Sequence, residues 1–115
     1  MVYTRQTAHA HLSAMKGADF GLIHADALQE NVFQTKSGLT LIDFDDAGFG
    51  YRGYDLGVCV SQHYAAGHLN DLIAAVAEGY GTLRKAPSID DIKFFLMLRG
   101  LASCGWVIAR QPQKD

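Results

Sequence analysis

The segment from Leu22 to Leu56 contains most of the side chains whose types and spacing suit a chemical reaction. His24, Asp26 and Asn31 form an H-x-D-x-x-x-x-N pattern, and a later apolar run ends at Asp43 in the sequence Asp-Phe-Asp. One carboxylate can accept a proton from a hydroxyl group, while an amide and a second carboxylate can hold a divalent metal ion on a nucleotide. The pattern therefore predicts one side of a site for phosphoryl transfer to an alcohol.

Each of these residues has an expected role in that hypothesis. Asp26 follows a short apolar strand, where it can accept the hydroxyl proton and orient the nucleophile. Asn31 and Asp43 provide oxygen ligands of the kind that Mg²⁺ prefers. Asp45 is a further metal ligand or a carboxylate that contacts the substrate. His24 comes directly after an apolar strand, so we expect it to be buried and to organise the loop.

The elements that must position these residues follow from the apolar pattern. Residues 20–23 form a short strand, and residues 32–35 and 39–42 form a hairpin around Gly38. Three glycines between 47 and 53 predict a loop. The expected helices cover residues 2–15, 55–66, 69–83 and 88–108, with Asp55 as a possible N-cap of the second. The predicted fold is α+β, with a small β-hairpin layer followed by a helical subdomain.

The composition places limits on the class of protein. The chain has 115 residues, 49% hydrophobic and 19% charged, which suits a single folded unit covering residues 1–115. A net charge of −2 provides no basic surface for nucleic acid or for an anionic membrane. No apolar run reaches the roughly 18 residues that span a bilayer. Cys59 and Cys104 are isolated in apolar segments, which predicts buried free thiols and a cytoplasmic location.

Three sequence strings resemble the aminoglycoside phosphotransferase and choline kinase family, whose fold is similar to that of protein kinases. They are H-A-D-x-x-x-x-N-V, L-I-D-F-D-D-A-G-F-G and Y-D-L, all within residues 22–56. The resemblance implies that Asp26 is the catalytic base and that Asn31 and Asp43 hold Mg²⁺ on ATP. It also implies that Asp55 supports the catalytic loop through hydrogen bonds from the start of a helix. The acceptor would be a small-molecule hydroxyl group.

The chain also departs from that family. Ala27 and Gln29 occupy positions where the family commonly has a bulkier apolar residue and a proline. The residues before Phe20 are too few to form the family's N-terminal nucleotide lobe of five strands. The resemblance therefore covers the C-terminal lobe, with the nucleotide lobe missing. We expect the isolated chain to transfer phosphate poorly or not at all.

Other interpretations of the same residues remain. The chain can be a non-catalytic binding module, or one that self-associates through apolar surface around Phe20, Leu22 and the hairpin. The string ending in Asp-Phe-Asp also resembles the first motif of haloacid-dehalogenase-like phosphatases, with Asp43 as the nucleophile, although helices rather than a parallel α/β sheet follow it. Aminoglycosides, choline-like alcohols, homoserine and sugars all suit the predicted site. Arg99, on the last predicted helix, is expected at the surface.

Overall fold

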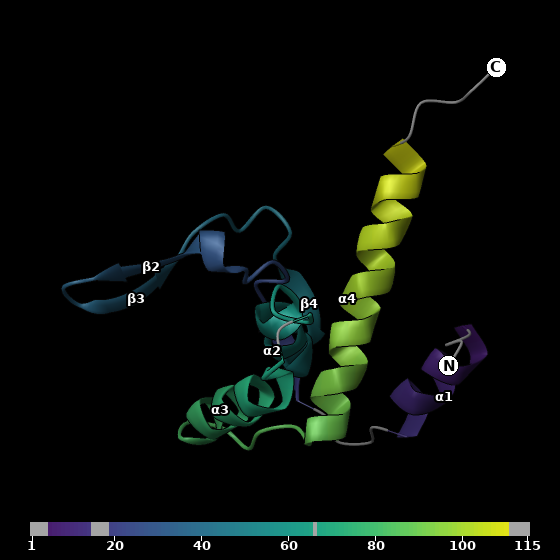
Figure 1. Ribbon diagram of the computed structural model, residues 1–115, viewed down its shortest axis with the longest axis horizontal. Coiled ribbons are helices and arrows are strands. Elements are labelled where there is room, and N and C mark those ends of the chain that lie inside the picture. The colour runs from purple at the N-terminus through teal and green to yellow at the C-terminus, as the bar shows by residue number, and fades with distance from the viewer. Residues whose placement is uncertain (1–4, 15–18, 66, 111–115) are drawn as a thin grey trace.

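The computed structural model is an α+β chain with two small antiparallel strand pairs, one beside the helices and one projecting away from them (Figure 1). It describes residues 5–14, 19–65 and 67–110, with side chains for 10–14, 19–65 and 67–102. The elements are α1 (Arg5–Ala14), β1 (Phe20–Ile23), the 3-10 turn η1 (Gln29–Asn31), β2 (Val32–Thr35), β3 (Gly38–Leu41), β4 (Gly48–Tyr51), α2 (Arg52–Ser61), α3 (Leu69–Gly81) and α4 (Ile89–Arg110).

The predicted hairpin is confirmed, whereas the predicted glycine-rich loop is partly wrong. Strands β2 and β3 pair from Val32↔Leu41 to Thr35↔Gly38, and Gly38 has a φ of 123°, which favours glycine. Residues 48–51, expected in a loop, form β4 and pair antiparallel with β1. A Cβ atom at Gly50 would lie 2.8 Å from the tip of the Ile23 side chain, so this glycine packs against β1 rather than forming a turn.

The helices lie close to the predicted ranges except for α2, which ends at Ser61 instead of reaching residue 66 and also starts earlier than expected. That helix begins at Arg52 with Tyr51 as its N-cap, so the prediction that Asp55 caps it is wrong. Helices α3 and α4 lie close to the expected residues. The N–H of Asp91 donates to Ser88 Oγ at 3.1 Å, as expected for a helix start. Residues 2–4 and 15 of the first predicted helix lie outside the described residues.

Two glycines allow α2 and α4 to pack closely side by side (Figure 1). A Cβ atom at Gly57 would lie 2.6 Å from the backbone nitrogen of Leu96, and one at Gly53 would lie 2.8 Å from the Phe95 ring. Glycines four residues apart lie on the same face of a helix. The sequence G-Y-D-L-G therefore fixes the distance between α2 and α4, and the site depends on that distance.

The buried apolar residues lie between the helices. Val60, Ile73 and Ile92 bring α2, α3 and α4 into one cluster, and Phe94 and Phe95 are also buried. The stacked ring of His11 joins α1 to this region, because it lies 4.0 Å from the Phe94 ring and its Nε2 is 3.1 Å from Asp91 Oδ1. The helices thus provide the rigid part of the fold.

Asp19, just before β1, links the strands to α2 and α3. Its carboxylate accepts hydrogen bonds from Arg84 at 2.8 Å, Arg52 at 2.6 Å and the Tyr80 hydroxyl at 3.0 Å. The Arg84 bond, against the opposing effect of burial and together with the bonds from Arg52 and Tyr80, lowers the pKa of Asp19 to about 2. The guanidinium of Arg52 lies against Gly21, where a side chain would displace it.

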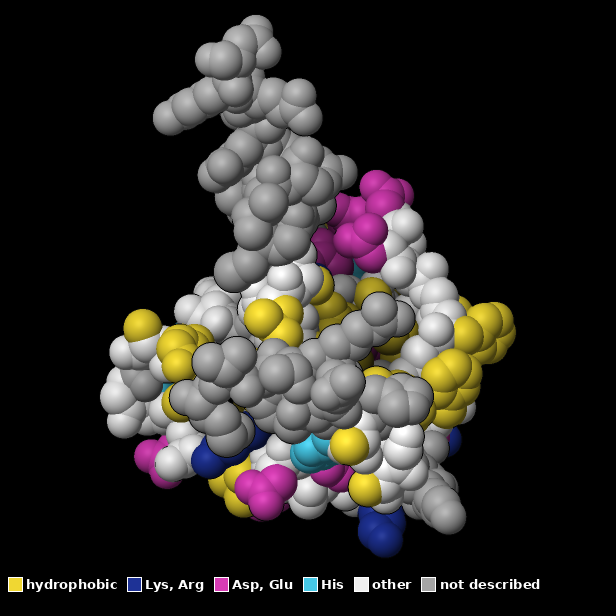
Figure 2. Space-filling model, turned by 90° about the vertical axis from the view of Figure 1, so that its right-hand side faces the viewer, with side chains coloured by type: hydrophobic (Ala, Val, Ile, Leu, Met, Phe, Trp, Pro, Cys, Tyr) yellow, Lys and Arg dark blue, Asp and Glu magenta, His cyan; other side chains and the backbone are white. Residues whose placement is uncertain are grey.

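The strands leave large apolar side chains exposed. Phe20, Leu22 and Phe49 on β1 and β4 are 58%, 65% and 80% exposed, and Leu39 on β3 is 75% exposed. Figure 2 shows hydrophobic side chains in several groups on one face, with acidic side chains gathered at the upper right. Exposed apolar patches of this kind often bind another molecule.

The sequence predicted buried free thiols and no membrane-spanning segment. Cys59 is free but exposed, so the prediction of a buried thiol is wrong for it, and the Cys104 side chain lies outside the described residues. Within the part of the chain that the structure describes, no helix has the length and apolar character to cross a bilayer.

Candidate active site

His24 organises the loop after β1 from a buried position. It is 5% exposed, as the sequence predicted. Its Nδ1 accepts the N–H of Asp26 at 3.1 Å, so the proton lies on Nε2, which donates to the Ile42 carbonyl at 2.8 Å. The ring also contacts Phe44 edge-on, with centroids 4.7 Å apart. One imidazole thus connects the loop to the end of the hairpin.

Asp55, in the first turn of α2, fixes the backbone of this loop. Its two carboxylate oxygens accept the N–H groups of His24 at 3.0 Å and Ala25 at 2.8 Å. Ala25 has a φ of 71°, a conformation that costs energy for any residue with a side chain. The Asp55 carboxylate holds Ala25 in that conformation. This arrangement agrees with the supporting role that the resemblance implied for Asp55.

Asp26 and Asn31 lie side by side in the structure, as the spacing predicted. The Asn31 amide donates to the Asp26 carbonyl at 2.9 Å and to Asp26 Oδ2 at 3.2 Å. Asn31 is 7% exposed, and the short turn η1 brings it back toward Asp26. Since both N–H bonds go to Asp26, the Asn31 Oδ1 atom is the part of the side chain left for a metal ion.

Arg99 on α4 is a site residue that the sequence analysis missed. Its Nη2 donates to Asp26 Oδ1 at 2.7 Å, and its Nη1 donates to the Ala25 carbonyl at 3.1 Å. Burial alone would lower the pKa of Arg99, but hydrogen bonds to Tyr54 and Asp26 raise it above its usual value. The prediction of a surface arginine is therefore wrong. No local signal separates it from other helix-surface arginines, because its partner lies 73 residues away.

The hairpin brings Asp43 next to this loop. The N–H of Ile42 donates to the Asn31 carbonyl at 2.9 Å, while His24 holds the Ile42 carbonyl. Asp43 is the next residue and has a φ of 60°, so the chain turns sharply there. Its Oδ1 accepts the N–H of Asp45 at a long 3.4 Å. Asp43 and Asp45 are both exposed, in contrast to Asn31.

The donor set suits a magnesium ion that is completed by a nucleotide. Mg²⁺ commonly takes one or two carboxylates and fills its remaining positions with phosphate oxygens and water. Asn31 and Asp43 supply an amide and a carboxylate oxygen from adjacent backbone segments. Among the described residues, no three His, Cys, Asp or Glu side chains group as a metal site. An amide and a carboxylate oxygen are ligands of the kind that a magnesium ion shares with a nucleotide. The metal role of Asn31, Asp43 and Asp45 stays a prediction.

Comparison with known proteins agrees with this geometry. Residues 3–92 match the model of the phosphotransferase enzyme family. Among solved structures, the chain is similar to a microcompartment-associated aminopropanol kinase, with 30% sequence identity and a TM-score of 0.77. The match covers 93% of this chain and 35% of that kinase, so the chain spans about 35% of its length. The comparison with curated proteins found no match.

Proposed function

Because the chain belongs to the phosphotransferase enzyme family, we propose that it carries the catalytic-loop part of an enzyme that phosphorylates a small-molecule hydroxyl group. The donor in this proposal is ATP with Mg²⁺. The observation that supports it is the convergence of Asp26 and Asn31, whose side chains are hydrogen-bonded at 3.2 Å. Ile42, the residue before Asp43, is bonded to both His24 and Asn31 at the two ends of the same loop.

Asp26 is the general base in this proposal. Asn31 and Arg99 each donate to one of its oxygens, which fixes the carboxylate plane. Each oxygen retains lone pairs, so the carboxylate can still accept the proton of an acceptor hydroxyl. Fixing the base before the acceptor binds lowers the entropy cost of the reactive arrangement. His24 and Asp55 contribute by holding the loop backbone.

Asn31 and Asp43 would hold the metal ion, and Asp45 is a candidate further ligand. When bound there, Mg²⁺ would supply positive charge that offsets the charge of the phosphate groups. The haloacid-dehalogenase alternative places a nucleophile at Asp43, but the family match and the bonded Asp26–Asn31 pair favour the kinase assignment. We place the protein in the cytoplasm, where ATP is available.

The acceptor is an alcohol, and the candidates are those of the family resemblance together with the aminopropanol in the name of the similar kinase. Aminoglycosides, choline-like alcohols and homoserine belong to that set. The chain spans 35% of the length of that kinase. We therefore propose that these 115 residues alone transfer phosphate slowly or not at all.

A titration with Mg·ATP tests this function without requiring turnover. We expect millimolar or tighter binding that depends on Mg²⁺ and disappears in Asp43→Ala. Asp46→Ala is the matched control, because Asp46 is an exposed carboxylate in the same segment and has no proposed metal role. Metal-independent binding, or equal binding by both variants, would contradict the proposal.

A second candidate function is a non-catalytic module that associates with another copy. The exposed Phe20, Leu22 and Phe49 favour it, because β1 and β4 pair Leu22 with Phe49 and so place them on one face. Sedimentation equilibrium distinguishes this candidate from the first. A dimer that Leu22→Lys converts to monomer would support it, and a monomer at high concentration would exclude it.

A further inference from the structure

The hairpin of β2 and β3 is the least covered part of the fold. Figure 1 shows it projecting from the body of the molecule, and no described helix or strand packs extensively against it. All of its strand residues except Val32 are exposed, with Phe33 and Leu39 at 52% and 75%. Two antiparallel strands on their own are only marginally stable in water. A hairpin of this kind therefore gains stability when a further strand pairs with it.

The outer edge of β3 carries backbone groups that point away from β2. The N–H of Ile42 donates to the Asn31 carbonyl at 2.9 Å, so these two residues form a hydrogen-bonded pair. Along an antiparallel ladder such pairs alternate with non-bonded pairs. The register then makes Leu39 and Leu41 members of non-bonded pairs, whose N–H and C=O groups face outward. Among the described strands, only β2 pairs with β3, so this edge is open to another strand.

The side chains of the hairpin do not protect this edge. Proteins commonly block an open edge with a lysine, a proline or another charged residue in the strand. Neither β2 nor β3 contains a charged residue or a proline, and Lys36 lies in the turn between them. Leu39 and Leu41 are two residues apart, so both side chains lie on the same face of the hairpin. The edge is therefore apolar as well as open.

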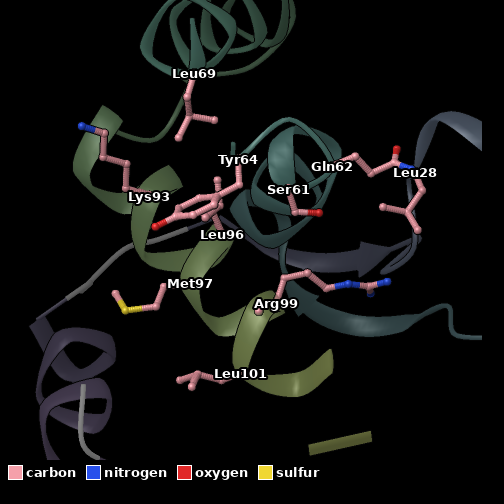
Figure 3. A pocket seen from close by; sticks show the side chains of 11 residues that line it. Leu28, Ser61, Gln62, Tyr64, Leu69, Lys93, Leu96, Met97, Arg99 and Leu101 are labelled. Atoms are coloured by element: carbon pink, nitrogen blue, oxygen red, sulfur yellow. The ribbon is translucent and has the colours of Figure 1, made fainter. Parts of the chain in front are cut away.

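A cavity between the helices offers an apolar surface of a different shape. It has a volume of about 770 Å³ and lies between α2, the start of α3 and α4, with Leu28, Leu96 and Met97 in its wall (Figure 3). Ser61 and Tyr64 also line it and add hydroxyl groups. A concave surface with a few polar groups suits a small molecule, whereas an open strand edge suits another strand. The hairpin therefore fits a polypeptide partner.

We propose that the outer edge of β3 pairs with β3 of a second copy of this chain. With a two-fold axis opposite Thr40, antiparallel pairing places Leu39 of each copy against Leu41 of the other. The outward N–H and C=O groups of these residues then bond to each other, and the leucine side chains of both copies gather on one face. The edge is complementary to itself, which favours a second copy over an unrelated strand.

Sedimentation equilibrium of the 115-residue chain tests this association. We expect a dimer whose dissociation constant rises by about tenfold or more in Leu39→Lys, because the leucine contact is lost and the two lysines lie diagonally across the pairing. Gln34→Lys is the matched control, since Gln34 lies opposite Leu39 and is also exposed but belongs to the edge of β2. Its dissociation constant should stay unchanged. A chain that remains monomeric, or equal weakening by both variants, overturns the proposal.

Amide hydrogen exchange locates the interface without any substitution. By the same register, the N–H groups of Leu39 and Leu41 face outward on β3, and those of Val32 and Gln34 face outward on β2. We expect the protection of the two β3 amides to rise with the chain concentration, while the two β2 amides exchange at an unchanged rate. Rising protection of the β2 amides alone would place the contact on the other edge and overturn the proposal.

A third variant separates this interface from the exposed face of β1 and β4. Leu22→Lys should leave the dimer intact, because β1 takes no part in the pairing of β3. If Leu22→Lys separates the copies and Leu39→Lys does not, the dimer forms through β1 and β4 and the proposal is wrong. The interface is also independent of the phosphotransferase function. A dimer that does not bind Mg·ATP contradicts that function alone, and a monomer that binds Mg·ATP contradicts the interface alone.

Discussion

The two halves of the candidate active site differ in how firmly the protein holds them. Asp26 lies in a loop that is bonded to α2, to α4 and to Ile42 at the end of the hairpin, and both of its carboxylate oxygens accept a hydrogen bond. Asp43 lies in an exposed turn, and its carboxylate accepts one long bond of 3.4 Å from Asp45. The base is thus positioned in advance, while the proposed metal side is open.

This difference has a physical reason. A proton acceptor works only in a narrow geometry, so holding it with buried hydrogen bonds favours the reaction. A metal ligand that shares Mg²⁺ with a nucleotide must stay free to bind, and the ion itself completes the arrangement. We therefore expect substitutions in the base half to reduce folding stability, and substitutions in the metal half to reduce binding alone.

Asp55→Ala should have the largest effect on stability. It leaves the N–H groups of His24 and Ala25 without their acceptor, and Ala25 loses the contact that holds its φ of 71°. We expect a loss of roughly 3 kcal/mol in the free energy of unfolding, since hydrogen bonds to charged groups contribute about 1.5–3 kcal/mol each. Urea denaturation measures it. Asp46→Ala, as the exposed control, should stay within about 0.5 kcal/mol.

Gly57→Ala should come next, because the added methyl group meets the backbone of α4 at 2.6 Å. Overpacking of this kind costs about 1–3 kcal/mol, and moving α4 also moves Arg99 away from Asp26. Gly79→Ala is the matched helical control, since its Cβ has open space. It should raise stability by about 0.5–1 kcal/mol through helix propensity. Thermal unfolding should show a lower melting temperature for Gly57→Ala and a higher one for Gly79→Ala. A change in the same direction for both variants would contradict the packing argument.

Acid should weaken the strand–helix junction at Asp19 through a smaller effect. The folded chain lowers the pKa of Asp19 from 3.8 to about 2, first through the Arg84 bond. The unfolded chain therefore binds this proton more readily, so the stabilisation is complete above about pH 4 and is lost as the pH falls toward about 2. We expect Asp19→Asn to flatten the acid limb of the melting temperature against pH. An acid limb of unchanged steepness would show that other carboxyl groups control it.

Asp43→Ala should have the smallest effect on stability although it removes Mg·ATP binding. The side chain is exposed and accepts a bond at 3.4 Å, so we expect a change within about 0.5 kcal/mol. The substitution also gives no relief of backbone strain. Position 43 has a φ of 60°, and alanine is no better suited to that conformation than aspartate. If Asp43→Ala lowered the free energy of unfolding as much as Asp55→Ala in the same urea titration, the proposed difference between the two halves would be wrong.

Local sequence patterns determined the strand, the hairpin and the helices, and they identified His24, Asp26, Asn31, Asp43 and Asp55 as candidates. These features depend on neighbours a few residues away or on motif spacing, so the sequence displays them directly. The error at residues 48–51 shows the limit of that reasoning. Three glycines indicate a loop when taken alone, but two of them, Gly48 and Gly50, lie in a strand that pairs with β1.

Only the tertiary structure decided the role of Arg99, the close approach of α2 and α4 at Gly57, and the cavity between the helices. Each joins segments that are far apart in the chain, and a helical pattern does not indicate which neighbouring helix a given face will meet. Whether an arginine lies in solvent or bonds the proposed base depends on how two helices pack. That packing is a property of the folded chain and not of any one segment.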